Sequence, residues 1–509
     1  MPSFFQTYGG ALYRMYCQLE ERSIAPESTD PLTRLSAKEA AKKIREGKLS
    51  SYELVKAYLD RIRFVNTYVN AVTESFDVEA LEEAKKVDEY IKSLDKGSEE
   101  YKNLAHTKPL LGVPVSIKHS FDVKGYRNIA GLAHRRDIPI ATEDADAVKL
   151  IRAAGGIPHC YSNVPPGCMW VETNNKVHGT TSSPYDTRTT CGGSSGGEGS
   201  VISAEGSVVG LGSDLGGSVR IPAILNGVFG LKSVDEIPLK GHYPTQGCED
   251  EGFRQLAQAG PLVRYAEDMA AMFSVLSSYP IPSNFVDLRP TKVLQTMPTS
   301  SITTPRVPVV QEAVPKVAKA ISSQFGVPLE EFDLPPLKQI MSWYFNEIAK
   351  PDMASPGECL LPHANQSNLV IEKIKAFIGV SKITPGPTSI IDPFGTPLPK
   401  EQALKLRQEL HEYRAKLHEI LKDDVVMVAP TLARNYYFHH ELVIAQVDWF
   451  QTAIFNVLAV PVATVPIGLD SEGYPISVQL VAARKNEFLL IRLQEHMEKK
   501  FGGWRPPKN

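Results

Sequence analysis

The sequence predicts an α/β protein in which a large, mixed, twisted β-sheet is covered by helices on both faces. Short apolar runs alternate with helical or glycine-rich segments between residues 110 and 232, which is typical of α/β architecture. Further apolar runs, Val425–Ala429 and Ile476–Val481, have the length of strands that return to the same sheet. With 509 residues the chain can form one large domain with surface insertions, which we expect rather than two separable domains.

The first helices of the domain are expected between residues 36 and 64. Ser36 and Ser50 each stand three residues before a glutamate, which is the spacing of a capping box at the start of a helix. Gly47 separates the two helical patterns, and a third, charged helix is expected at about residues 78–94.

The central part of the chain supplies four expected strands, with the helix Ala145–Ala154 between the first two. In sheets of this kind the loops at strand ends usually carry the functional residues. The four strands are Val113–Ile117, Ile157–Tyr161, Val208–Leu211 and Val228–Leu231.

The C-terminal half is expected to combine surface insertions with a return to the sheet. Residues 282–308 are rich in Pro, Ser and Thr, and we expect insertions around residues 282–398. The long amphipathic helix Glu401–Leu421 then precedes the returning strands. The other expected elements are the helices Leu337–Ala349 and Leu369–Phe377 and the strand Val460–Ile467.

Residues 1–34 form an N-terminal segment in front of a single domain at residues 35–509. Within this segment Phe4–Leu19 is apolar but interrupted by polar residues and glycines. It lacks a basic start and a clear cleavage site, so we expect no signal peptide. Two interpretations stay open, a helix that packs on the domain and an interfacial helix that rests on a membrane.

The composition excludes several classes of function. Lys and Arg (55) nearly balance Asp and Glu (58), so we expect no nucleic-acid partner and no electrostatic attraction to anionic lipid. There is no run of about 18 apolar residues that would predict a transmembrane helix. Six scattered cysteines without a CxxC pair indicate free thiols in a reducing, intracellular compartment.

The most informative stretch is a glycine- and serine-rich block at residues 192–222. It contains Ser194, Ser195 and Ser218, and an apolar run further upstream ends at Lys118. Serine is a poor nucleophile unless a base lies within hydrogen-bonding reach. These residues supply a nucleophile, a relay hydroxyl and an amine base, so acyl transfer is expected without histidine, metal or cofactor.

The backbone amides of Leu215, Gly216, Gly217 and Ser218 are the candidate oxyanion hole, because glycines let consecutive N–H groups point at one oxygen. A flexible linker and a phosphate-binding loop are the alternatives. A linker would not normally lie between apolar, strand-like runs. The block also lacks a Gly-Lys-Ser/Thr pair and a GxGxxG at a strand–helix junction, so catalysis is favoured.

With these residues the chain resembles the amidase-signature family. The family's Gly-Gly-Ser-Ser-Gly-Gly block and its Gly-x-Asp-x-Gly-Gly-Ser-x-Arg-x-Pro motif are present from Gly192 to Pro222, and Gly-Val-Pro-x-x-x-Lys ends at Lys118. The resemblance implies the amidase-signature fold. Within the family the chain is most similar to the type 2 fatty-acid amide hydrolases, in the stretches Cys168–Trp170, Asn174–Gly179, Gly260–Asp268 and Phe501–Trp504.

The resemblance implies a Ser-Ser-Lys triad. Ser218 would be the nucleophile, Ser194, on a cis peptide bond, would relay a proton, and Lys118 would be the base. The base must be a neutral amine, so burial has to lower its pKa from about 10.4. The supporting residues would be Ser195, Asp214 and Arg220. Whether the last two form a bracing ion pair or a surface pair stays open.

Several neighbouring residues have more than one interpretation. His119 stands where many family members have an acidic residue, which bears on the tuning of Lys118 but leaves the base in place. Met169 and Trp170 are candidates for an acyl channel or for core packing. Cys191 is expected to be a buried thiol rather than a nucleophile.

The resemblance implies a serine hydrolase that cleaves carboxylic amides to free acid and amine. The leading substrates are fatty-acid primary amides and N-acylethanolamines. The alternatives are a short-chain or aryl amidase, the glutaminase subunit of an amidotransferase, and a non-catalytic binding protein. Besides the amide substrate, we expect peripheral contact with an internal membrane or a lipid droplet, and a homodimer.

Overall fold

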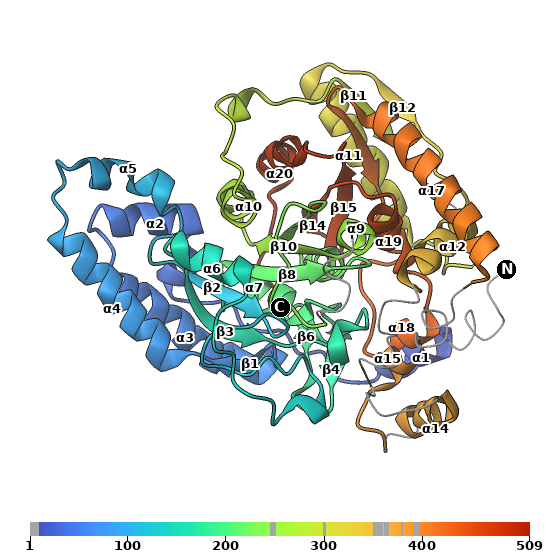
Figure 1. Ribbon diagram of the computed structural model, residues 1–509, viewed down its shortest axis with the longest axis horizontal. Helices are drawn as coiled ribbons and strands as arrows, with labels where there is room; N and C mark the ends of the chain where they lie inside the picture. Colours follow the sequence, from blue (N-terminus) through green and yellow to red (C-terminus); the bar gives the residue numbers. More distant parts are fainter. Residues whose placement is uncertain are drawn as a thin grey trace.

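The centre of the molecule is one sheet of 11 strands with helices packed on both of its faces (Figure 1). The predicted α/β architecture is therefore confirmed. Among the described helices, none is both long and apolar enough to cross a membrane. The computed structural model describes residues 10–244, 251–298, 302–349, 360, 366–377, 380–389 and 398–508.

In sheet order the strands are β1 (Val72–Ser75), β3 (Ile157–Ser162), β2 (Pro114–Lys118), β8 (Val209–Asp214), β10 (Gln258–Val263), β9 (Phe229–Lys232), β14 (Val462–Leu469), β15 (Pro475–Val481), β13 (Val425–Ala429), β11 (Lys292–Gln295) and β12 (Leu329–Glu331). The sheet is mixed. β2 is parallel to β3 and β8, while β8, β10, β9, β14, β15 and β13 run antiparallel to one another in turn. Two small hairpins lie apart, β4 (Asn174–Asn175) with β5 (Gly179–Thr180) and β6 (Ser182–Ser183) with β7 (Asp186–Thr190).

The side chains of β13 show that the sheet is buried on both faces. Val426 and Val428 belong to the apolar core on one face, whereas Val425, Met427 and Ala429 belong to the core on the other. Successive residues of a strand point to opposite faces, so a strand covered on both sides needs a continuous apolar sequence.

The described helices are α1 (Gly10–Cys17), α2 (Ala37–Arg45), α3 (Ser51–Val69), α4 (Asp77–Ser93), α5 (Glu99–Thr107), α6 (Asp146–Ala153), α7 (Gly196–Ser203), α8 (Arg220–Leu225), α9 (Glu251–Leu256), α10 (Met269–Ser277), α11 (Pro308–Phe325), α12 (Leu337–Ile348), α14 (Gln366–Phe377), α15 (Pro385–Ser389), α17 (Lys400–Leu421), α18 (Glu441–Ile444), α19 (Phe450–Val457) and α20 (Glu487–Phe501). Helices α6, α10, α11 and α20 contribute to the core on one face of the sheet. Helices α8, α12, α17 and α19 contribute to the core on the other face (Figure 1).

The two predicted capping boxes are present at the starts of α2 and α3. Ser36 Oγ accepts the backbone N–H of Glu39 at 3.1 Å, and Ser50 Oγ accepts that of Glu53 at 3.3 Å. Each serine thereby satisfies one of the N–H groups that a helix start leaves without a partner.

Residues 282–398 differ from the surface insertions that we expected. Strands β11 and β12 lie in this range and form the parallel edge of the sheet beside β13. Helix α11, between these two strands, packs on β11 and β15. Strand β11, which lies between β13 and the edge strand β12, buries only Val293 and Leu294, and such a short apolar run is not distinctive in a Pro-rich sequence.

Helix α1 packs on the domain through one face only. Arg14 donates to the carboxylate of Glu441 at 2.8 Å, and the Tyr13 hydroxyl donates to the His439 carbonyl oxygen at 2.6 Å. Residues 4–9 of the predicted segment lie outside the described residues. On the other face Leu12, Met15 and Tyr16 remain exposed, and Leu19 is exposed in the turn that follows the helix.

Candidate active site

The candidate catalytic residues meet where two parallel strands end. Lys118 is the last residue of β2, and Asp214 is the last residue of β8. Because β2 and β8 are parallel neighbours, their carboxyl ends lie side by side at the same end of the two strands. The loop that bears Ser194 leads into α7, and the loop that bears Ser218 joins β8 to α8.

The amine of Lys118 is fully buried, and its neighbours are three oxygen atoms and the thiol of Cys168. Its Nζ lies 2.7 Å from Ser194 Oγ, 2.8 Å from Ser213 Oγ and 3.3 Å from the Ser213 carbonyl oxygen. Burial disfavours the charged form and so lowers the pKa of Lys118. A neutral amine can accept a proton, as a general base must. The groups that oppose the shift are Cys168, Asp214 and Glu198.

The loop that carries Ser194 has no room for a residue larger than glycine at position 193. The peptide bond between Gly193 and Ser194 is cis. A Cβ on Gly193 would lie 2.8 Å from the backbone nitrogen of Glu172 and 2.8 Å from the carbonyl oxygen of Trp170. The backbone therefore fits closely against this neighbouring segment only because residue 193 is glycine.

Ser195 joins the two loops that carry the candidate serines. Its N–H donates to the Ser218 carbonyl oxygen at 3.1 Å, and its hydroxyl donates to the Ser213 carbonyl oxygen at 3.2 Å. Ser194 and Ser218 line the same pocket. The pocket wall also contains the apolar side chains of Met169, Leu215, Leu239 and Ala257.

The loop at residues 215–218 is crowded by side chains from the C-terminal half of the chain. A Cβ on Gly216 would lie 2.7 Å from the ring of Trp449. Gly217 has φ +124°, and a Cβ there would overlap the hydroxyl of Thr452. Both the available space and the backbone angle therefore require glycine in this loop.

One predicted oxyanion donor has another partner in this structure. The N–H of Gly217 donates to Asp214 Oδ1 at 2.8 Å, because the carboxylate at the end of β8 turns back over the following loop. This differs from the prediction that Gly217 serves the oxyanion. The predicted donors without this contact are the amides of Leu215, Gly216 and Ser218.

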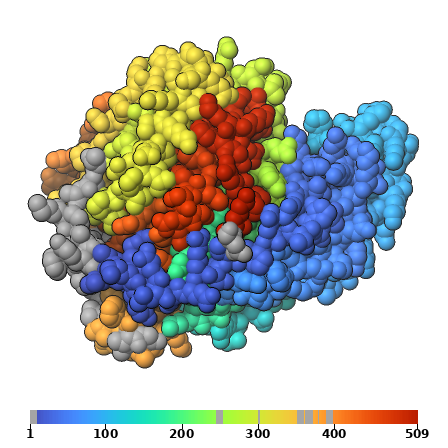
Figure 2. Space-filling model, turned by 180° about the vertical axis from the view of Figure 1, so that it is seen from behind, coloured from blue at the N-terminus to red at the C-terminus, as the bar shows by residue number. Residues whose placement is uncertain are grey.

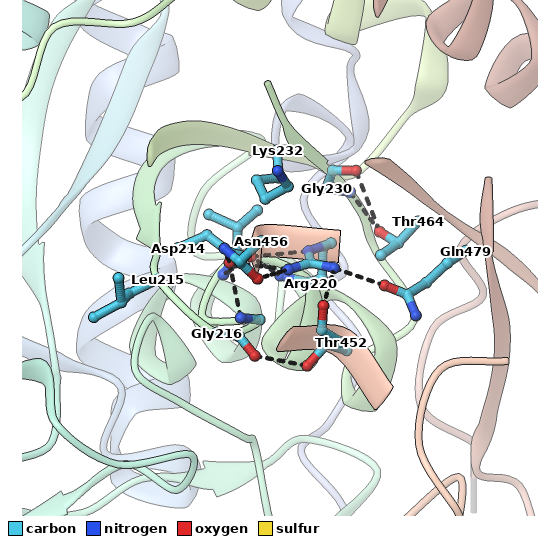
Figure 3. Close-up of polar contacts among 12 residues, drawn as sticks. Asp214, Leu215, Gly216, Arg220, Gly230, Lys232, Thr452, Asn456, Thr464 and Gln479 are labelled. Atoms are coloured by element: carbon cyan, nitrogen blue, oxygen red, sulfur yellow. Dashed lines mark hydrogen bonds and ion pairs between the residues drawn. The ribbon is translucent and has the colours of Figure 1, made fainter. Parts of the chain in front are cut away.

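Asp214 and Arg220 form a buried ion pair below this loop, not a surface pair. Arg220 Nε lies 3.0 Å from Asp214 Oδ2, and neither side chain is exposed. Burial raises the pKa of Asp214, but the charge and hydrogen bonds of Arg220 outweigh it and keep this pKa below its usual range. Figure 3 shows Arg220 also donating to the Thr452 carbonyl (2.8 Å), Gln479 Oε1 (2.9 Å) and Asn456 Oδ1 (2.5 Å).

His119 is a structural residue. Its ring stacks on Tyr161, with centroids 4.1 Å apart, and its Nε2 lies 2.8 Å from the Arg127 carbonyl oxygen. A carbonyl can only accept, so Nε2 carries the proton and Nδ1 accepts from the Thr73 hydroxyl at 2.8 Å. Burial lowers the pKa of His119 to about 3, so the ring is neutral and both nitrogens are bonded to the scaffold.

The two channel candidates separate in the structure. Met169 lines the pocket that Ser194 and Ser218 share, whereas Trp170 is absent from its described lining and belongs to the apolar core. Trp170 packs below α15, so closely that a Cβ on Gly386 would overlap its indole. Cys191 is fully buried, and burial raises the pKa of its thiol, which favours an inert residue.

Sequence reasoning missed two contributors to the site. Ser213 precedes Asp214 in the glycine-rich motif, yet its contact with Lys118 depends on the register between β2 and β8. His242 lies in a segment without a catalytic motif, and its Nε2 lies 2.8 Å from Ser213 Oγ. A strand-register argument could have found the serine, but no local signal marks the histidine.

The glycine-rich loops, the paired serines and the buried lysine therefore lie together at one pocket. The sequence model of one family, described as Amidase, matches residues 53–491. The chain therefore belongs to the amidase family, recognised above from its signature motifs, and it is an amide hydrolase.

Its relatives include fatty-acid amide hydrolases. Fatty-acid amide hydrolase 2-A of Danio rerio is 34% identical over 98% of this chain and 94% of its own length. Fatty-acid amide hydrolase 2 of Homo sapiens is 33% identical over 94% of this chain and 91% of its own length. A solved structure described as fatty acid amide hydrolase has a TM-score of 0.74 at 21% identity, covering 93% of this chain and 86% of that one. The expected fold is thereby confirmed.

Proposed function

We propose that the protein hydrolyses fatty-acid amides through an acyl-enzyme on Ser218, with Ser194 as the relay and Lys118 as the base. The observation that supports this most strongly is the 2.7 Å contact between the buried Lys118 Nζ and Ser194 Oγ. This contact lies at the pocket to which Ser218 also belongs. A neutral amine beside a hydroxyl is the activated arrangement that a serine nucleophile needs.

Acylation begins when Ser218 Oγ attacks the carbonyl carbon of the amide. As the new C–O bond forms, the proton of Ser218 passes to Ser194 Oγ, and the proton of Ser194 passes to Lys118 Nζ, which becomes an ammonium. The carbonyl oxygen takes up the negative charge. The amides of Leu215, Gly216 and Ser218 are the donors proposed to stabilise it.

The tetrahedral intermediate then collapses to an ester on Ser218. The C–N bond breaks, and the proton on Lys118 returns through Ser194 to the leaving nitrogen, which departs as the neutral amine. Deacylation repeats the sequence with water as the nucleophile. It releases the free acid and restores the Ser218 hydroxyl and the neutral lysine.

Fatty-acid amides are the proposed substrates because the family relatives and the pocket chemistry agree. Two relatives that match nearly the whole chain are fatty-acid amide hydrolases. Met169, Leu215 and Leu239 give the wall beside the serines an apolar surface against which an acyl chain can pack. Ser213, Ser218 and Gln258 supply the polar groups of this pocket for the amide end.

We also propose that the enzyme contacts a lipid surface. Helix α14 packs on α15, α15 packs on α18 and α18 packs on α1, so α1 and α14 lie at the same end of the molecule (Figures 1 and 2). Two helix faces whose apolar side chains are exposed among the described residues lie at one end, and such faces are suited to rest on a bilayer. Besides the exposed side chains of α1, this end includes Ile371, Ile374, Phe377 and Val380. An intracellular location and a homodimer stay predictions from the sequence.

Flotation with phosphatidylcholine vesicles tests the lipid contact. Leu12→Glu combined with Phe377→Glu should reduce the bound fraction, because both side chains are exposed and a charge disfavours insertion. Val78→Glu, at an exposed apolar residue of α4, is the matched control and should bind like the wild type. Equal binding by the double variant would refute the contact.

A matched series of amides tests the proposed function. Rates are measured on acetamide, hexanamide, oleamide and an N-acylethanolamine, with Ser218→Ala as the control. A rate that rises with chain length and is lost in the variant is the expected result. Activity confined to short or aryl amides would keep the mechanism and reject the substrate class.

Turnover that survives in Ser218→Ala would reject the nucleophile. If the wild type turns over no amide of the series, glutamine hydrolysis with and without a partner protein separates the glutaminase from the non-catalytic alternative. Labelling of the wild type, but not of Ser218→Ala, by a fluorophosphonate would show that Ser218 is a reactive nucleophile.

A further inference from the structure

A second set of polar side chains extends from Lys118 to His242, and Ser213 and His242 of this set line the same pocket as Ser194. Ser213 Oγ contacts both Lys118 Nζ at 2.8 Å and His242 Nε2 at 2.8 Å. Ser120 Oγ lies 3.0 Å from the same His242 nitrogen. These side chains are almost entirely buried, and the proton transfers proposed for catalysis do not involve His242, Ser213 or Ser120.

The contacts of His242 determine which of its ring nitrogens carries the proton and which one accepts a hydrogen bond. The backbone of Pro244 bonds the His242 ring, and since Nε2 faces the serines, the nitrogen involved is Nδ1. A carbonyl only accepts, so Nδ1 carries the proton, and the lone pair of Nε2 faces the hydroxyls of Ser213 at 2.8 Å and Ser120 at 3.0 Å. Ser213 can therefore donate its proton to His242 and accept an N–H from Lys118.

A neutral lysine amine has two N–H groups and one lone pair, and Lys118 has three oxygen contacts besides the thiol of Cys168, which is a weaker hydrogen-bonding group. The Ser213 carbonyl oxygen, at 3.3 Å, takes one N–H, and Ser213 Oγ takes the other. The lone pair is then left for Ser194 Oγ at 2.7 Å. If the Ser213 hydroxyl turned around, it would donate to the same lone pair and compete with Ser194.

We propose that His242 is a positioning residue that holds the Ser213 hydroxyl turned away from Lys118, so that the lysine lone pair faces Ser194. This inference rests on the proposed function and deepens it. His242 accepts a hydrogen bond and takes no proton in the reaction.

The charged neighbours of Lys118 define what a pH profile can report. Burial and the charge of Lys118 lower the pKa of His242 to about 3, so its ring stays neutral in the assay range. Burial raises the pKa of Glu198, on α7, to about 7, and this residue titrates in that range. Because Glu198, Asp214 and Cys168 are common to all variants, differences between variants isolate the contribution of His242.

Two amide substitutions at residue 242 test the inference. In His242→Gln the side-chain carbonyl reaches the place of Nε2 and can accept from Ser213. His242→Asn is matched in polarity but reaches only the place of Nδ1. We expect His242→Asn to lower kcat about 5- to 10-fold, the equivalent of one hydrogen bond, with little change in KM. His242→Gln should recover most of the rate.

The pH profile separates positioning from a structural defect. In His242→Asn the Ser213 hydroxyl can donate to the neutral amine, which favours the neutral form and lowers its pKa. The acidic limb of kcat should therefore move to lower pH, by up to about one unit for a hydrogen bond of this strength. A structural defect would lower the plateau and leave the limb in place.

A double-mutant cycle completes the test. Ser213→Ala removes the hydroxyl that His242 orients, so His242→Asn should have no further effect in that background. An equal loss in both backgrounds, or an unmoved acidic limb, would overturn the inference. If the residue 242 variants fail to fold, Ser213→Thr, which keeps the hydroxyl, is compared with Ser213→Ala, and identical pH profiles would overturn it. Turnover by Ser218→Ala would instead overturn the proposed function.

Discussion

Two buried basic side chains lie at the end of β8, and their surroundings are opposite. Arg220 is paired with the carboxylate of Asp214 at 3.0 Å and is further held by neutral oxygens of three other residues. Lys118 is surrounded at close range by the oxygens of Ser194 and Ser213, and burial lowers its pKa. Arg220 is fixed in place by a carboxylate at hydrogen-bonding distance, whereas Lys118 lies among hydroxyl groups and burial lowers its pKa.

The largest expected effect comes from removing Lys118, the proposed base. Lys118→Met should lower kcat about 10²- to 10⁴-fold, which is the usual contribution of a general base. Between the lowered pKa of the folded chain and the usual value of about 10.4, the unfolded chain binds a proton that the folded chain does not. The amine therefore costs stability at neutral pH, and this variant should melt at a higher temperature than the wild type.

Steady-state kinetics measures the expected fall in kcat of Lys118→Met, and thermal unfolding of the same samples measures the expected rise in its melting temperature. Full activity of Lys118→Met at neutral pH would exclude this lysine as the base. A lower melting temperature would mean that Lys118, like Arg220, stabilises the fold, and the contrast between the two cations would fail.

The second-largest expected effect is the loss of stability when the ion pair between Asp214 and Arg220 is broken. Asp214→Asn leaves the Arg220 charge buried without its counter-charge, which typically costs about 3–5 kcal/mol of unfolding free energy. The folded-state pKa of Asp214 is held below its usual range, so its contribution is complete at neutral pH. The contribution is lost as the pH falls from about 4 toward the lowered pKa.

Urea unfolding at several pH values measures this contribution. The wild type and Asp214→Asn should differ most at neutral pH, and the two stabilities should converge in acid. A difference below about 1 kcal/mol at pH 7 would place the pair among weak surface contacts, contrary to its burial.

The smallest effect concerns the tuning of Lys118 by Glu198. The carboxylate raises the pKa of Lys118 through its charge, in opposition to burial. Glu198→Gln removes that charge, so the acidic limb of kcat should move to lower pH. The pH dependence of kcat measures this shift of the acidic limb. The control is Glu495→Gln, on the partly exposed helix α20. A limb that moves upward would contradict the assignment.

Much of the fold was predictable because its signals are local. The capping serines of α2 and α3 and the apolar strands β2, β3, β8, β9, β13, β14 and β15 are recognisable within a few residues of sequence. Strand β11 and the edge strand β12 were missed because their pairing partners are distant in sequence. Strand β10 contains Gly260 and Pro261, which are unusual inside a strand.

The site was predictable where motif and function coincide. Lys118, Ser194 and Asp214 stand in signature motifs, whereas His242 reaches the site from a segment without one. Met169 and Trp170 show a second limit of prediction from sequence. Consecutive residues of an irregular segment point in different directions, so sequence could not decide which of Met169 and Trp170 lines the pocket.

The packing around residues 215–218 determines how the enzyme can be redesigned. Gly216 and Gly217 admit no side chain, because Trp449 and Thr452 occupy the space that a Cβ would need. A mutant library aimed at a different acyl chain therefore gains nothing from varying this loop. Met169 and Leu239 form a different part of the pocket wall, and their side chains can be shortened or lengthened without disturbing the catalytic backbone.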